Sequence, residues 1–124
     1  MKKIILVVED ERLTRTIIAA TLKQYGMHCV EAENGQDALA LLSTQHFDLI
    51  LTDLRMPVMN GVELIKTVRE REKTAGDAPM PIVVLSAEKG EMVDAALQLG
   101  VCGYFIKSAS VEELIPLLQQ LLAD

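Results

Sequence analysis

The chain alternates short apolar runs with longer amphipathic stretches. The runs are too short for helices and are rich in aliphatic and β-branched residues, which is typical of strands buried on both faces of a parallel sheet. They predict five strands, at Ile4–Val8, Met27–Ala32, Phe47–Leu51, Ile82–Leu85 and Gly103–Ile106.

The stretches between and after the runs have helical periodicity. They predict helices at Arg12–Tyr25, Gly35–Thr44, Val62–Lys73 and Glu88–Leu99, and a last helix beginning after Ser110. Asn34 is an expected N-cap, and Ser110 with Glu113 is an expected capping box. Gly90 should weaken the first turn of the fourth helix, and Pro116 should kink the last helix or loosen its start.

Strands that alternate with helices predict an α/β fold with a parallel sheet. Right-handed crossovers of this length would make it a doubly wound, three-layer sandwich. With 124 residues and no repeat, linker or low-complexity segment, residues 1–124 are expected to form a single domain.

Composition limits the partners and the compartment. Eighteen acidic and twelve basic residues give a net charge of −6 without a Lys/Arg cluster, which argues against direct contact with nucleic acid or an anionic membrane. No apolar stretch suits a signal peptide or a bilayer span. Cys29 and Cys102 lack metal-ligand spacing and are predicted to be buried thiols in a reducing compartment, so a cytoplasmic location is expected.

Candidate chemistry lies where the strands end. A single Asp after a strand, such as Asp53, is more often a turn former or a helix cap than a reactive group. However, every other strand except the second also ends at polar residues, which are Glu9-Asp10, Ser86 and Lys107. Because the carboxyl ends of parallel strands share one edge of the sheet, all these side chains are predicted to meet there.

If the strand order is 2-1-3-4-5, the first and third strands are neighbours, and Glu9, Asp10 and Asp53 share a pocket. Three close carboxylates repel one another, and Mg²⁺ (or Mn²⁺) would relieve that repulsion. Lys107 and Ser86 would complete a cradle for a phosphoryl group carried by Asp53 as the nucleophile.

Three other functions are known for domains of this general kind or size, and each makes its own demand on the sequence. A nucleotide- or flavin-binding domain needs a phosphate loop rich in small residues after the first strand, where this chain has Glu9-Asp10-Glu11. An aspartyl-phosphate phosphatase needs a cap domain, for which the chain has no room. A module that acts by protein contact alone, without phosphorylation, remains the alternative.

The segments that carry this chemistry resemble a known family. They are Val7–Glu11, Thr52–Gly61, Leu85–Ala87 and Gly103–Lys107. Over essentially its whole length the chain resembles the receiver domain of bacterial two-component response regulators, of the chemotaxis (CheY-like) type. The resemblance implies a flavodoxin-like fold, with a sheet of order 2-1-3-4-5 and five helices.

The resemblance implies a metal site in which Asp10 and Asp53 bind Mg²⁺ directly, Glu9 binds it through water, and Arg55 binds it through its backbone carbonyl. Asp53 would be the phosphoacceptor. Glu9 stands where the family often has Asp, a difference that a water-mediated role tolerates.

It also implies how phosphate would act on the domain. Ser86 would hydrogen-bond the phosphoryl group, Lys107 would pair with it, and Tyr104 would change rotamer on activation. The fourth helix, fifth strand and fifth helix would present that change to a partner. The chain would not be an enzyme acting on outside substrates, although self-dephosphorylation is compatible with this chemistry.

The implied partners are a histidine kinase or histidine phosphotransfer protein as phosphodonor, and a downstream protein or attached output domain. A homodimer is compatible with the resemblance.

Two features depart from the family pattern. Ser108 follows Lys107 where the family usually has a cis-proline, and because a cis bond to a non-proline residue costs about 2.5–4 kcal/mol, this bond is predicted to be trans. Gly90 and Pro116 predict an atypical output surface. The last helix is also rich in leucine, which indicates either a wide core face or a partner contact, and its leucines are Leu114, Leu117, Leu118, Leu121 and Leu122.

Overall fold

The computed structural model of the chain describes residues 3–87, 90–107 and 110–123. Its strands form one parallel sheet in the order β2-β1-β3-β4-β5. They are β1 (Ile4–Val8), β2 (His28–Ala32), β3 (Leu49–Asp53), β4 (Ile82–Ser86) and β5 (Gly103–Ile106). The predicted α/β class and strand order are confirmed, although β3 begins later than predicted and extends through Asp53.

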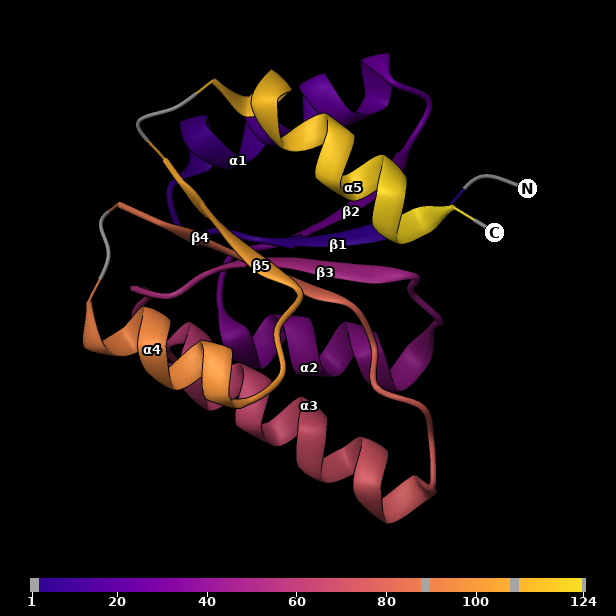
Figure 1. Cartoon of the computed structure of the whole chain (residues 1–124), viewed down its shortest axis with the longest axis vertical. Coiled ribbons are helices and arrows are strands. Elements are labelled where there is room, and N and C mark those ends of the chain that lie inside the picture. The colour runs from indigo at the N-terminus through magenta and orange to yellow at the C-terminus, as the bar shows by residue number, and fades with distance from the viewer. Residues whose placement is uncertain (1–2, 88–89, 108–109, 124) are drawn as a thin grey trace.

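Helices cover both faces of this sheet. They are α1 (Arg12–Gln24), α2 (Gly35–Thr44), α3 (Gly61–Ala75), α4 (Glu91–Gln98), the short 3₁₀ helix η1 (Val111–Leu114) and α5 (Ile115–Leu122). In Figure 1, α1 and α5 lie on one side of the sheet and α2, α3 and α4 lie on the other, so the molecule has three layers. Among the described residues, no helix is both long enough and apolar enough to cross a bilayer.

The sheet separates two hydrophobic cores, because successive side chains of a strand point to opposite faces. In β1, Leu6 and Val8 pack toward α2–α4, whereas Ile5 and Val7 pack toward α1 and α5. Every residue of β3 and β4 is buried. These central strands are therefore covered on both faces, as their apolar runs predicted, and the polar residues at their ends emerge at one edge.

The start of α4 differs from the prediction. The helix begins at Glu91, and Gly90 is its N-cap in an extended conformation. Gly90 therefore lies outside the helix and does not weaken its first turn. Residues 88–89, where the helix was predicted to begin, lie outside the described residues.

The predicted capping box before the last helix is wrong. The Ser110 hydroxyl accepts a hydrogen bond from the Glu112 N–H rather than from that of Glu113, and the first turn is the 3₁₀ helix η1. The α-helix proper begins at Ile115. Pro116 therefore lies in the first turn of α5, where the helix does not need a proline N–H.

The helices α1 and α5 differ in how much of their apolar surface they bury. In α1, Ile18 and Leu22 are buried, whereas Ile17 and Tyr25 are exposed. The leucines of the last helix are all buried or half-buried against the core beneath α1 and α5. That packing favours the wide core face over the partner contact.

The two cysteines differ in environment. Cys102 is exposed, which makes the prediction of two buried thiols wrong, because it lies in the turn between α4 and β5. Cys29 is half-buried in β2 and packs toward α1 and α5. Burial, together with the charge of Glu31, raises the pKa of the Cys29 thiol to about 11.

This difference predicts two rates of thiol labelling. Because only the thiolate reacts, and burial disfavours the Cys29 thiolate, a disulfide reagent such as DTNB at pH 8 should label Cys102 quickly and Cys29 slowly. The slow rate should rise about tenfold per pH unit up to pH 10 while the protein stays folded. Cys102→Ser should remove the fast phase. A single fast phase that accounts for both thiols of the wild-type chain would contradict the assignment.

Candidate functional site

Three carboxylates meet at the carboxyl edge of the two central strands. Asp53 is the last residue of β3, and Glu9 and Asp10 follow β1, whose Val8 pairs with Thr52. Carboxylate oxygens of Glu9, Asp10 and Asp53 lie within 4.8 Å of one another. The strand order brings these residues together, as the sequence predicted for neighbouring first and third strands.

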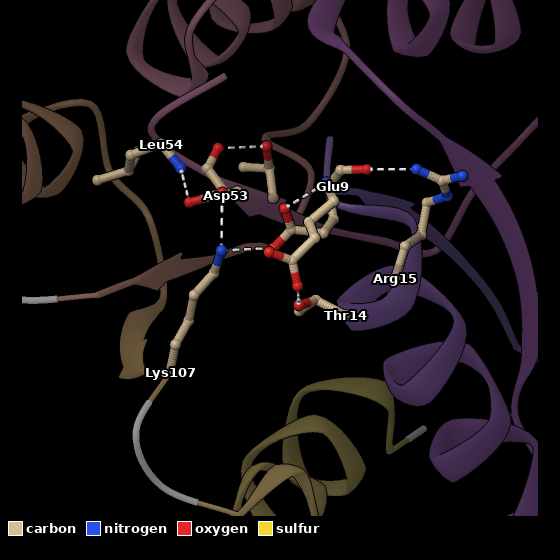
Figure 2. Close-up of polar contacts among 8 residues, drawn as sticks. Glu9, Thr14, Arg15, Asp53, Leu54 and Lys107 are labelled. Carbon is tan, nitrogen blue, oxygen red and sulfur yellow. Dashed lines mark hydrogen bonds and ion pairs between the residues drawn. The ribbon is translucent and has the colours of Figure 1, made fainter. Parts of the chain in front are cut away.

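Lys107 reaches into this cluster from the end of β5. Its ammonium lies 2.8 Å from Asp53 Oδ2 and 2.5 Å from Glu9 Oε1 (Figure 2). Burial alone would lower the pKa of Lys107, but the hydrogen bond with Asp53, the close contact with Glu9 and attraction to both charges hold its pKa above the ordinary value. The side chain is therefore a charged ammonium that bridges two buried acids.

Glu9 is fully buried, which is unusual for an acid. Its Oε2 accepts a hydrogen bond of 3.1 Å from the Glu11 N–H. Among the described residues, Oε1 has the ion pair with Lys107 but no hydrogen-bond partner of good geometry. Burial raises the pKa of Glu9 to about 7, although the contacts with Lys107 and Glu11 act to lower it. The buried carboxylates of Glu9 and Asp53 thus share the ammonium of Lys107.

Asp53 is held at the end of β3 by its neighbours. The Leu54 N–H donates to its Oδ1 at 2.7 Å, and the Thr52 hydroxyl donates to its carbonyl at 2.8 Å. Gly61 packs so closely that a Cβ there would lie 2.3 Å from the same carbonyl. The Asp53 carboxylate is therefore buried and held in one orientation, with Oδ2 facing Lys107 (Figure 2).

The other predicted residues lie around this cluster. Ser86 ends β4, and its carbonyl accepts from the Lys107 N–H at 2.8 Å. Ser86 and the exposed Arg55 line a hollow of about 70 Å³ beside the first turn of α4. Tyr104 is half-buried in β5 and packs toward α2–α4. The bond from Lys107 to Ser108, predicted to be trans, lies outside the described residues.

The donor set fits a hard divalent cation. Mg²⁺ prefers oxygen ligands and is held by one or two carboxylates together with water. The cluster offers three carboxylates within reach of one ion, and two of them share the Lys107 ammonium. Glu9, Asp10 and Asp53 are the described residues that could hold such an ion.

Arg15 is a neighbour of the site that the sequence reasoning missed. Its guanidinium donates to the Glu9 carbonyl at 2.8 Å and to Glu31 Oε1 at 3.1 Å (Figure 2 shows the first contact). The only signal in the sequence was a basic residue in the first turn of a helix, where the dipole disfavours positive charge.

The sheet has the order 2-1-3-4-5, and its acids and lysine lie at the carboxyl ends of the strands. In doubly wound α/β proteins, this edge is where ligand sites form, at the point where the strand order reverses. Residues 5–119 match the family model of the response regulator receiver domain, and the chain belongs to that family. Its predicted place in two-component signal transduction is thereby confirmed.

Solved structures and curated relatives agree with this family. The chain is similar to the chemotaxis response regulator CheY4 of Vibrio cholerae, with a TM-score of 0.87, 31% identity and coverage of 98% of this chain and 100% of that one. It is also similar to the response regulator TrrA of Thermotoga maritima, solved in complex with Mg(2+)-BeF, with a TM-score of 0.84, 30% identity and coverage of 97% and 99%.

Among curated proteins, the transcriptional regulatory protein PhoB of Pseudomonas aeruginosa is 38% identical over 97% of this chain. The sensor kinase/phosphatase LuxN of Vibrio harveyi is 37% identical over 70% of it. The chain spans 52% of the length of PhoB and 10% of the length of LuxN.

Proposed function

We propose that this receiver domain is a phosphoacceptor switch in which Asp53 takes a phosphoryl group from a phosphohistidine. The observation that carries the proposal is the arrangement of Asp53, with Oδ1 held by a backbone N–H and Oδ2 2.8 Å from the Lys107 ammonium. A carboxylate fixed in direction beside a positive charge suits in-line attack on phosphorus.

In the transfer, an Asp53 carboxylate oxygen attacks the phosphorus and forms a P–O bond. The P–N bond of the phosphohistidine breaks, and its electron pair returns to the imidazole ring. Lys107 offsets the negative charge of the transferring group, since its ammonium already lies at Asp53 Oδ2.

Mg²⁺, or Mn²⁺ in its place, would be held directly by Asp10 and Asp53 and through water by Glu9, with the Arg55 carbonyl as a further ligand. When bound, it neutralises charge on the phosphoryl oxygens. The clustered carboxylates support this assignment, as does the complex of the related TrrA with Mg(2+)-BeF.

Phosphate at Asp53 would change the domain because Lys107 has two anionic partners in the unphosphorylated chain. The new phosphoryl oxygens would compete with Glu9 for Lys107 and would attract the Ser86 hydroxyl. Ser86 ends β4 beside the start of α4, so a shift there would reach Tyr104 and the face made by α4, β5 and α5.

The partners follow from the same chemistry. The donor would be a histidine kinase or a histidine phosphotransfer protein, and a downstream protein or an output domain would read the switched face. The curated relatives support both roles, since LuxN is named a sensor kinase/phosphatase and PhoB a transcriptional regulator.

The test uses a small phosphodonor. Incubation with acetyl phosphate and Mg²⁺ should add one phosphoryl mass to the intact chain, and the adduct should be lost with EDTA. Asp53→Asn should abolish the adduct, since the amide is not a nucleophile for this transfer.

The matched control is Asp48→Asn, which makes the same change at the opposite end of β3, where the Asp48 carboxylate accepts from the Ile4 N–H. That variant should still be phosphorylated. An adduct that persists in Asp53→Asn would mean that another residue is the acceptor. No adduct on a folded chain that binds Mg²⁺, with a kinase donor also ineffective, would favour the module that acts by contact alone.

A further inference from the structure

Arg15 makes contacts that a surface arginine does not need. It lies in the first turn of α1, and its side chain is 13% exposed. A cation at the N-terminal end of a helix is opposed by the helix dipole. The ion pair with the half-exposed Glu31 is of a kind that contributes little. These costs point to another reason for the arginine.

That reason is the backbone of Glu9. The β1 ladder ends at Val8, so the Glu9 carbonyl lies beyond the paired strands and needs a donor from elsewhere. Arg15 supplies that donor at 2.8 Å, while the Glu9 N–H donates to the Ala32 carbonyl at 3.1 Å. Both backbone groups of Glu9 thus have hydrogen-bond partners, and Figure 2 shows the contact of its carbonyl with Arg15.

We propose that Arg15 is a positioning residue of the acidic site, which holds the Glu9 carbonyl and thereby aims the carboxylates of Glu9 and Asp10 toward Asp53. Glu31, which pairs with the Arg15 Nε at 3.1 Å, orients the guanidinium for this contact. The inference rests on the proposed function, since its consequence is the affinity of the site for Mg²⁺.

Removal of Arg15 should change the affinity for Mg²⁺ in opposite directions, depending on whether the residue positions the ligands or acts only through its charge. Arg15 is a positive charge near the site, and its removal by electrostatics alone would strengthen the binding of a cation. If Arg15 positions the ligands, its removal weakens binding instead. Loss of a residue that orients metal ligands typically lowers metal affinity about 10- to 100-fold.

Calorimetric titration of the whole chain with Mg²⁺ tests this. Arg15→Gln should bind Mg²⁺ about tenfold more weakly than the wild type. Arg15→Lys, which keeps the charge and one donor, should fall between the two, and Glu31→Gln should show a smaller loss. Arg12→Gln removes an exposed charge from the same helix turn and is the matched control, with affinity equal to or above that of the wild type.

A second measurement separates positioning from general damage. Arg15→Gln should need about tenfold more Mg²⁺ than the wild type for half-maximal phosphorylation by acetyl phosphate, and excess Mg²⁺ should recover most of the loss, because the affinity for the cation is what is reduced. Unchanged or tighter binding by Arg15→Gln would overturn the assignment of Arg15 and leave the proposed function intact. If Arg15→Gln does not fold, wild-type affinity in Arg15→Lys overturns it. A wild-type chain that binds no Mg²⁺ would instead overturn the proposed function, and this inference with it.

Discussion

Gly61→Ala should lower the free energy of unfolding by more than about 3 kcal/mol, a loss that is large for one methyl group. A Cβ at this position would lie 2.3 Å from the Asp53 carbonyl oxygen and 2.8 Å from the Leu54 Cα. Both atoms belong to the backbone and cannot turn away as a side chain can. The Gly61 N–H also donates to the Leu54 carbonyl at 2.8 Å, so moving α3 outward would break that bond.

Urea denaturation followed by circular dichroism measures this loss, and two other glycines calibrate it. At Gly103 a Cβ would meet only Leu117 Cδ2, at 3.5 Å, so Gly103→Ala should change stability by less than about 1 kcal/mol. At Gly35 it would meet the side chain of Met59, which can move in part, so Gly35→Ala should fall between the two. Equal losses in the three variants would show that the close approach at Gly61 does not decide the effect.

The fold was largely predictable because its central strands are buried on both faces. The aliphatic runs of β1, β3 and β4 have few alternatives to a parallel sheet, and polar residues end each of them. The same ends placed Glu9, Asp10, Asp53 and Lys107 at one edge. The polar residues that mark the ends of the apolar runs are also the residues of the site. The same pattern therefore predicted both the strand ends and the site.

Helix starts were less predictable because several capping arrangements suit similar sequences. The capping box forms instead between Asn60 and Glu63 at the start of α3. The predicted box at Ser110 became a 3₁₀ turn, since Pro116 is better accommodated in the first turn of the following helix.

Contacts between distant residues were not predictable from local pattern. Arg15 donates to a residue six positions earlier and to one in β2, and Arg69 in α3 donates to the carbonyls of Leu99, Gly100 and Met80. Such arginines act through a long side chain that can reach many partners, and only the folded arrangement selects among them. The roles of Ser86, Tyr104 and Arg55 stay predictions for a related reason, because they concern the chain with bound metal or phosphate.

The second large effect should appear when the bridging lysine is removed. Lys107→Met, in EDTA, should lower the free energy of unfolding by about 2–3 kcal/mol, because it leaves Glu9 and Asp53 buried without a positive partner. This loss of stability should be smaller than for a fully buried ion pair, because the Lys107 side chain is 26% exposed and solvent screens its charge. A cation present at 100 times its dissociation constant contributes about 2.7 kcal/mol. Excess Mg²⁺ should therefore narrow the difference from the wild type, because the variant, which lacks the competing lysine charge, should bind Mg²⁺ more tightly and gain more stability from it.

Thermal or urea denaturation with EDTA and with Mg²⁺ gives the four values needed for Lys107→Met and the wild type. Lys66→Met, an exposed lysine on α3, is the matched control and should change stability by less than about 0.5 kcal/mol in either condition. Adding Glu9→Gln to Lys107→Met should recover part of the metal-free loss, because it removes one of the two unpaired charges.

If Lys107→Met were equally destabilised with and without Mg²⁺, the loss would come from packing of the lysine stem. Dependence on Mg²⁺ together with recovery by Glu9→Gln would instead show that Lys107 and a divalent cation neutralise the same acids. The lysine would then hold the site together until a cation binds, and would become free to pair with a phosphoryl group once it does.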